Sequence, residues 1–222
     1  MLTRTLLAVI LVLCTSFAFA VPFGDLNFES AAVPDPGPYF DSLEWASVAP
    51  RWSHSSGDDT GWVYYYHPHL GCSQWFMLVD QYNHYGYSPL SGNYSLALQS
   101  GGLYSGDTHP WVNAFISISG YFPYSASQIR LKATGNFGVY VNNTRISMFG
   151  GGSSYYADVS AYRGKNATVR IQNEDVYDEE WYLHTPVLVD DIQVPLVPEP
   201  SGCLILAMSL IGSGLLIRRK RA

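Results

Sequence analysis

Residues 129–143 read IRLKAT-GN-FGVYV-NN. Apolar and polar side chains alternate with a period of two in both longer runs, which is the pattern of β-strands that bury one face. Glycine and asparagine tolerate the positive φ angles of tight turns, so Gly135-Asn136 and Asn142-Asn143 predict turns after the two runs. The stretch therefore predicts two successive β-strands, each followed by a short turn.

Similar strand patterns recur over most of residues 21–196. Further strands are predicted at 61–67, 74–80, 94–99, 112–119, 167–172 and 187–194. Clusters of Gly, Pro, Asn and Ser separate these segments, and no apolar pattern of helical period is long enough to predict a helix. Strands of this number in one domain of about 176 residues predict an all-β fold, a two-sheet antiparallel sandwich.

The first 20 residues predict a secretory signal peptide. Arg4 gives a charged start, residues 6–13 an apolar core, and the Ala-Phe-Ala sequence at 18–20 a small-residue cleavage site. Cleavage before Val21 leaves residues 21–196 as the predicted sandwich domain. This domain contains one cysteine, Cys72, so it cannot form an internal disulfide.

Residues 197–222 form a second terminal segment. It consists of the sequence VPEPS, an apolar run over 202–217 and four basic residues at 218–221. The prolines disfavour a helix that extends backwards, the apolar run can enter lipid, and the basic end resists crossing a membrane. The three parts predict a transmembrane helix whose basic end stays inside the cell.

This terminal segment resembles the PEP-CTERM sorting signal of bacteria that produce exopolysaccharide. The resemblance implies that an exosortase, a membrane cysteine protease, recognises Pro198, Glu199 and Pro200 and processes the tail during export. It also implies transient anchoring in the inner membrane and a final location in the cell envelope, at the cell surface or in the extracellular matrix. The other interpretation is an ordinary membrane anchor that follows a proline-containing linker.

The charge of the predicted domain limits its partners. Without the two ends, the Lys and Arg count falls from 12 to 7 and the Asp and Glu count from 18 to 17, which gives a net charge of about −10. This charge argues against a nucleic-acid partner, because both would be negative. It also favours neutral polysaccharide, or contacts bridged by divalent cations, over direct binding of an acidic polysaccharide. The other interpretation is that the charge only keeps an exported protein soluble.

Four short motifs in the domain resemble the galactose-binding-like jelly roll of many carbohydrate-binding modules. They are Asn-Phe-Glu at 27–29, GNYSLAL at 92–98, ADVSAYRGK at 157–165 and Val-Asp-Asp-Ile at 189–192. The resemblance implies a jelly-roll topology. It does not by itself imply a function, because the fold has sugar-binding, adhesive and purely structural members.

In many modules of that kind a calcium ion joins the first and last strands. The resemblance implies that Glu29 and Asp190 or Asp191 hold a structural calcium ion in this chain. Calcium takes six to eight oxygen ligands, and carboxylates and carbonyl groups supply them. The other interpretation is that these carboxylates are solvated and bind no metal.

Aromatic residues are abundant, with 6 Trp and 17 Tyr in the chain. An exposed ring stacks on the C–H face of a sugar, while neighbouring polar groups bind the hydroxyls. Tyr82, Tyr85 and Tyr87 belong to a polar segment at 81–88 and are predicted to be the exposed, ligand-binding set. A position in the core is the other interpretation for each aromatic residue.

The sequence predicts that the protein is not an enzyme. Its six histidines are scattered along the sequence. No motif indicates a catalytic nucleophile or a pair of catalytic carboxylates. The predicted function is a non-catalytic glycan-binding module associated with exopolysaccharide. The alternative is a structural or adhesive matrix or envelope protein without a sugar site.

Overall fold

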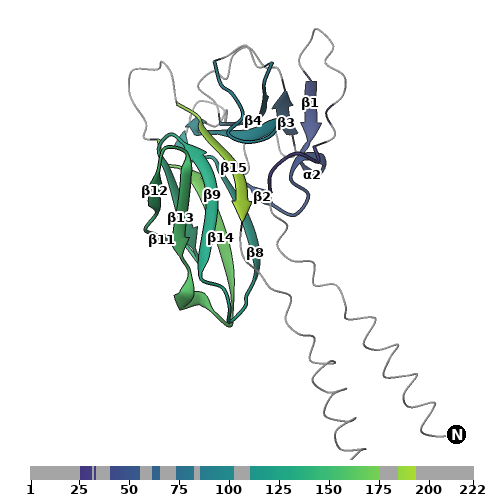
Figure 1. Cartoon of the computed structure of the whole chain (residues 1–222). Coiled ribbons are helices and arrows are strands. Elements are labelled where there is room, and N and C mark those ends of the chain that lie inside the picture. Colours follow the sequence, from purple (N-terminus) through teal and green to yellow (C-terminus); the bar gives the residue numbers. More distant parts are fainter. Residues whose placement is uncertain are drawn as a thin grey trace, which may run out of the picture. The chain divides into compact units, whose positions relative to one another are not determined.

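The structure, a computed structural model, describes residues 26–31, 33, 41–55, 62–65, 74–82, 86–102, 111–175 and 185–193. These residues form two main β-sheets that pack face to face as a sandwich (Figure 1). The predicted all-β fold with two packed sheets is confirmed. The predicted signal peptide, the predicted sorting motif and the apolar C-terminal run lie outside the described residues.

The larger sheet has eight strands in the order β1-β3-β4-β5-β15-β9-β13-β12. Their bounds are β1 Asp41–Glu44, β3 Trp62–Tyr65, β4 Trp75–Asp80, β5 Tyr94–Gln99, β15 Val187–Gln193, β9 Gln128–Thr134, β13 Ser154–Asp158 and β12 Phe149–Gly151. Neighbouring strands are antiparallel except β3 and β4, which are parallel. The prediction of a purely antiparallel sandwich is wrong at this pair. Nine residues of sequence lie between the two strands, and only a connection as short as a two-residue hairpin would force antiparallel pairing.

The smaller sheet has five strands in the order β11-β10-β14-β8-β2. Their bounds are β11 Thr144–Ile146, β10 Phe137–Val141, β14 Lys165–Asn173, β8 Phe115–Phe122 and β2 Ser53–His54. A ribbon of β6 Gly101–Gly102 and β7 Trp111–Val112, a short helix α2 at Trp45–Val48 and a 3-10 turn η1 at Ser160–Tyr162 complete the described elements. Among the described residues no helix has the length and hydropathy needed to cross a membrane.

The two predicted turns of residues 129–143 are present, and they have different roles. Asn142 and Asn143 have φ angles of 51° and 63° and close the hairpin between β10 and β11. Gly135 instead carries the chain from β9 in one sheet to β10 in the other. Its φ is 92°, and a Cβ atom there would lie 3.2 Å from the carbonyl oxygen of Pro186, so both backbone geometry and space favour glycine.

Alternate side chains of both sheets fill the space between them. Fully buried examples are Leu78, Leu96, Leu98, Ile129 and Val189 from the larger sheet and Ile116, Val139, Val169 and Ile171 from the smaller sheet. Burying one such side chain is worth roughly 1.5–3 kcal/mol of transfer free energy. The alternation that predicted the strands is therefore also the source of the core.

Asn173 ties the two sheets together through its buried side chain. It belongs to β14, and its Nδ2 donates to the carbonyl oxygen of Leu98 on β5, in the other sheet, over 2.9 Å. The same amide donates to Thr185, and its Oδ1 accepts from the backbone N–H of Asp175 at 2.7 Å. These bonds fix the position of one sheet on the other, because each partner is a backbone group with few alternatives.

We expect Asn173→Ala to lower the free energy of unfolding by about 3 kcal/mol, since it leaves buried backbone groups without partners and opens a small cavity. Urea denaturation of the variant and of the parent protein measures this change. Asn166→Ala is the matched control, because Asn166 lies on the same strand with its side chain exposed. Equal stabilities for the two variants would contradict a tie between the sheets.

Candidate functional site

The outer face of the larger sheet, which points away from the smaller sheet, has a covered half and an open half. Residues that pair across neighbouring strands share a face, so the register defines rows of side chains on it. One row is Met77, Ala97, Leu188 and Thr134. A second contains Val79 and Ser95, then Asp190, Lys132 and Ser154, and a third is Gln193, Arg130, Tyr156 and Phe149.

The covered half is a small second core. Met77, Val79, Ala97 and Leu188 are buried there, although they point away from the sandwich interior. The side chains of Tyr64, Tyr87 and Leu90 pack on this cluster. Residues 76–80 are thus buried on both faces of the sheet, and the segment that includes Tyr87 and Leu90 provides the second cover.

Asp190 lies at the edge of this covered half and is fully buried. Its Oδ2 accepts from the hydroxyl of Ser95 at 2.8 Å, and its Oδ1 accepts from the backbone N–H of Asp191 at 2.7 Å. Burial disfavours the charged carboxylate and raises the pKa of Asp190 to about 6, although these hydrogen bonds act in the opposite direction. Asp190 is therefore a titrating group inside the fold.

A polar boundary separates the two halves. Lys132 Nζ lies 2.9 Å from Asp191 Oδ2 and donates to Ser91 Oγ over 2.7 Å. The hydrogen bond from Lys132 holds the pKa of Asp191 below its ordinary value. The three side chains join the segment before β5 to β9 and β15, and so form one wall of the open half.

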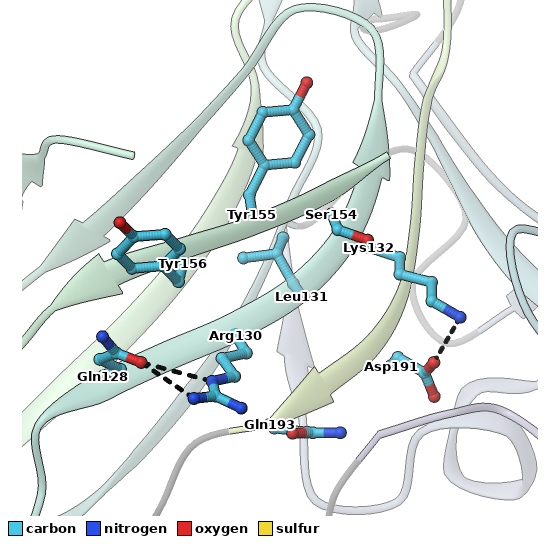
Figure 2. Close-up of a pocket in the computed structure, with 9 residues that line it drawn as sticks. All are labelled: Gln128, Arg130, Leu131, Lys132, Ser154, Tyr155, Tyr156, Asp191 and Gln193. Carbon is cyan, nitrogen blue, oxygen red and sulfur yellow. Dashed lines mark hydrogen bonds and ion pairs between the residues drawn. The ribbon is translucent and has the colours of Figure 1, made fainter. Parts of the chain in front are cut away.

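The open half is a groove of about 500 Å³ on the strands β9, β13 and β15 (Figure 2). Its lining residues are Gln128, Arg130, Leu131, Lys132, Ser154, Tyr155, Tyr156, Asp191 and Gln193. Figure 2 shows Tyr156 beside Gln128 and Arg130, whereas the ring of Tyr155 points elsewhere. Hydrogen-bonding side chains thus surround an aromatic ring at the groove.

An aromatic platform extends this groove toward the sheet edge. Tyr156 is 42% exposed and Phe149, opposite it on β12, is 51% exposed. The two rings stack with centroids 5.6 Å apart and planes 28° from parallel. Each ring supports the other, so the pair presents an apolar surface without being buried in the core.

The residues predicted to bind a ligand lie elsewhere. Tyr82 is exposed, as predicted, with 62% of its surface accessible. Tyr87 differs from the prediction, because it is half-buried on the second core, and this burial raises the pKa of its phenol. Tyr85 lies outside the described residues. A ligand role for the three remains a prediction, and the described structure gives Tyr87 a packing role.

The predicted calcium ligands use their oxygens in hydrogen bonds. Glu29 Oε1 accepts from the backbone N–H groups of Asn93 and Tyr94, at 2.7 and 3.1 Å, and its Oε2 accepts from the Asn93 side chain at 2.7 Å. The carboxylate occupies the space that a Cβ atom on Gly92 would need. This bonding ties the opening segment to the start of β5.

Asp190 and Asp191 likewise meet hydrogen-bond donors and a lysine, whereas calcium requires a shell of oxygen ligands. Within the described ranges no three His, Cys, Asp or Glu side chains form a group that could hold a metal ion. Calcium at Glu29 and the Asp pair stays a prediction. Thermal melts with calcium and with chelator decide between the two arrangements, because a bound ion raises the melting temperature and hydrogen bonds alone leave it unchanged.

Sequence reasoning missed most of the groove. The sequence pointed to no role for Arg130 and did not distinguish Tyr156 from the other tyrosines, since their pairing depends on which strand lies beside β9. The signal for one of them was present: Ser154, Tyr156 and Asp158 alternate with Tyr155 and Ala157, which places Tyr156 on the polar face of a strand. Phe149 gave no such signal, because glycines follow it.

No protein-family model and no curated protein matches the chain. Among solved structures, the chain is similar to the K1 cleaved adhesin domain of Lys-gingipain from Porphyromonas gingivalis. The TM-score is 0.41 and the identity 9%, over 72% of this chain and 99% of the adhesin domain. A likeness of this strength says nothing about a shared ligand.

We expect Asp190→Asn to gain stability relative to the parent protein as the pH rises from about 4 to 7. The folded pKa of Asp190 is raised, so its contribution to stability is complete below about pH 4 and is lost as the pH rises through about 6. The neutral amide avoids this loss, which is about 3 kcal/mol. Urea denaturation at several pH values, with chelator present, measures the difference.

Asp191→Asn is the control for this titration, because its carboxyl pKa is lowered and its effect has the opposite sign. That variant should lose stability relative to the parent as the pH rises toward about 4, and the difference should then stay constant up to about pH 7. A stability difference between Asp190→Asn and the parent protein that stays constant from pH 4 to 7 would contradict a raised pKa at Asp190.

Proposed function

We propose that the protein is an exported, non-catalytic glycan-binding module whose sugar site is the groove on β9, β13 and β15. The observation that carries the proposal is the row of Phe149, Tyr156, Arg130 and Gln193 across four strands of an open sheet face. It joins two exposed stacked rings to a guanidinium group and an amide. This combination of an apolar plane and hydrogen-bonding groups suits a pyranose ring.

The row also has the right extent for a chain of sugars. Neighbouring strands are about 4.8 Å apart, so four strands place the outer members of the row roughly 14 Å from each other. Two or three sugar rings of a polysaccharide would cover a row of this length. Weak binding, from about micromolar to millimolar, is expected of an open site with few stacking contacts.

The location that we propose is the cell envelope, the cell surface or the extracellular matrix of a bacterium. The signal-peptide pattern of residues 1–20 and the PEP-CTERM-like segment at 197–222 support it. The proposed partners are an exosortase, the inner membrane before processing, and a polysaccharide of the matrix, neutral on the evidence of the overall charge. A jelly-roll topology, a structural calcium ion and the absence of catalysis belong to the same proposal.

Tyr156→Ala and Phe149→Ala should each weaken binding of a matrix polysaccharide about tenfold, since a lost stacking contact is worth about 1 kcal/mol or more. Neither should lower the melting temperature markedly, because both rings are exposed. Affinity electrophoresis in gels that contain matrix fractions measures the binding. Tyr124→Ala is the matched control, because Tyr124 is 78% exposed and does not line the groove.

Tyr82→Ala separates the groove from the loop that the sequence favoured. A loss of binding in that variant alone would move the site to residues 81–88. Failure of the parent protein to bind any matrix fraction at millimolar sugar, with calcium present, would instead favour the structural or adhesive alternative.

The proposed sorting makes a separate prediction. Replacing Pro198, Glu199 and Pro200 with alanine should leave the chain unprocessed and held in the membrane of its native host, because the exosortase would no longer recognise it. Mass spectrometry of the mature protein measures processing. The same mature mass with and without the substitutions would favour an ordinary membrane anchor.

A further inference from the structure

The charge of the groove is opposite to the charge of the domain. Residues 21–196 contain 7 Lys and Arg residues against 17 Asp and Glu residues. The groove nevertheless contains two of the seven basic side chains, Arg130 and Lys132, and one acidic side chain, Asp191. An acidic protein thus places a local excess of positive charge beside its exposed aromatic platform.

Only one of the two basic groups is neutralised. Lys132 forms an ion pair with Asp191 and donates to Ser91. The guanidinium of Arg130 instead contacts Gln128 Oε1, through Nε at 3.4 Å and Nη2 at 3.2 Å, which are long hydrogen bonds to a neutral amide. Figure 2 shows this contact at the groove. In the part of the chain that the structure describes, no carboxylate lies within ion-pair distance of Arg130.

Asp158, the acidic residue closest to Arg130 in the strand register, does not neutralise the arginine. Asp158 pairs with Gln128 on β9, one position along its face from the Tyr156–Arg130 pair. Its carboxylate accepts the backbone N–H of Ser160 at 2.8 Å, and that bond holds the pKa of Asp158 below its ordinary value. Asp158 is thus bonded at the end of its own strand.

Other arginines of the domain are engaged within the fold. Arg145 binds Glu174 through two hydrogen bonds of 2.8 and 2.7 Å. Arg170 lies over the rings of Phe115 and Tyr140, at 5.3 and 4.5 Å from their centroids. Arg163 donates to the carbonyl oxygen of Ala126 at 2.5 Å. Arg130 differs from these three because its planar fork of donors faces solvent with only an amide as partner.

The position of Arg130 suits a substituent on a stacked sugar. Arg130 and Tyr156 are directly paired on β9 and β13, so their Cβ atoms are about 5 Å apart. That distance is close to the width of a pyranose ring. A ring stacked on Tyr156 therefore brings a group on its rim next to the guanidinium, which binds a carboxylate through two parallel hydrogen bonds.

We propose that the groove selects glycans that contain a uronic acid, with Tyr156 under the sugar ring and Arg130 on its carboxylate. The inference rests on the proposed glycan-binding function and names its ligand class. It departs from the neutral polysaccharide expected from the net charge of the domain, because the charge close to the ligand outweighs charges beyond about 10 Å in physiological salt.

The test compares matched oligosaccharides on the purified full-length protein. The probes are oligomers of galacturonate, glucuronate, mannuronate and guluronate, each with a counterpart in which the carboxyl groups are reduced to alcohols. We expect at least one acidic oligomer to bind about tenfold more tightly than its reduced counterpart. Arg130→Gln should abolish this ratio, and raising the salt concentration should reduce it.

Lys165→Gln is the matched control, because it removes one positive charge from an exposed position on the smaller sheet. It should keep the preference for the acidic oligomer. Polyglutamate, an acidic peptide, tests whether charge alone suffices, and it should bind much more weakly than the best uronate.

The outcomes separate this inference from the proposed function. Equal binding of every acidic oligomer and its reduced form would overturn the inference and leave a glycan-binding groove. Loss of the preference in Lys165→Gln, or polyglutamate binding as tight as that of the uronates, would overturn it as well. No binding of any oligomer, acidic or reduced, would remove the proposed function and the inference together.

Discussion

The β-bulge in β15 decides what the groove contains. Asp190 pairs with Lys132 and Gln193 pairs with Arg130, so two residues of β15 stand opposite the single residue between Lys132 and Arg130 on β9. Without the bulge, Ile192 would pair with Arg130 and would place an apolar side chain in the groove. The extra residue instead buries Ile192 completely and turns Gln193 outward. Asp191, with φ of 45°, absorbs the change of direction.

The same strand links the covered and open halves of the outer face. Before the bulge, Leu188 belongs to the second core, on which Tyr64, Tyr87 and Leu90 pack, and Asp190 lies buried at its edge. After the bulge, Gln193 lines the groove. The ion pair of Lys132 and Asp191 lies between the halves. The groove is therefore held by side chains of both halves, so the packing of one affects the shape of the other.

Sequence reasoning found the strands whose alternation is regular and missed features that depend on pairing. The runs at 94–99 and 167–172 fall within β5 and β14, since burial of one face or both leaves a readable pattern. Phe149–Gly151 forms a strand although glycine weakens strands, because β13 supplies the hydrogen bonds. The groove joins β9 to β15 across more than fifty residues of chain, and period-two patterns carry no information about such partners.

The bridge between Leu26 and Ile192 affects how the domain would respond to tension on the chain. Their backbones exchange two hydrogen bonds, of 3.0 and 2.9 Å, so the described part of the domain begins and ends at neighbouring points. Tension applied through the chain on both sides of the domain would peel this pair apart rather than shear many bonds together. The three hydrogen bonds of Glu29 would bear the load next. Under such tension the domain would therefore yield first at this bridge.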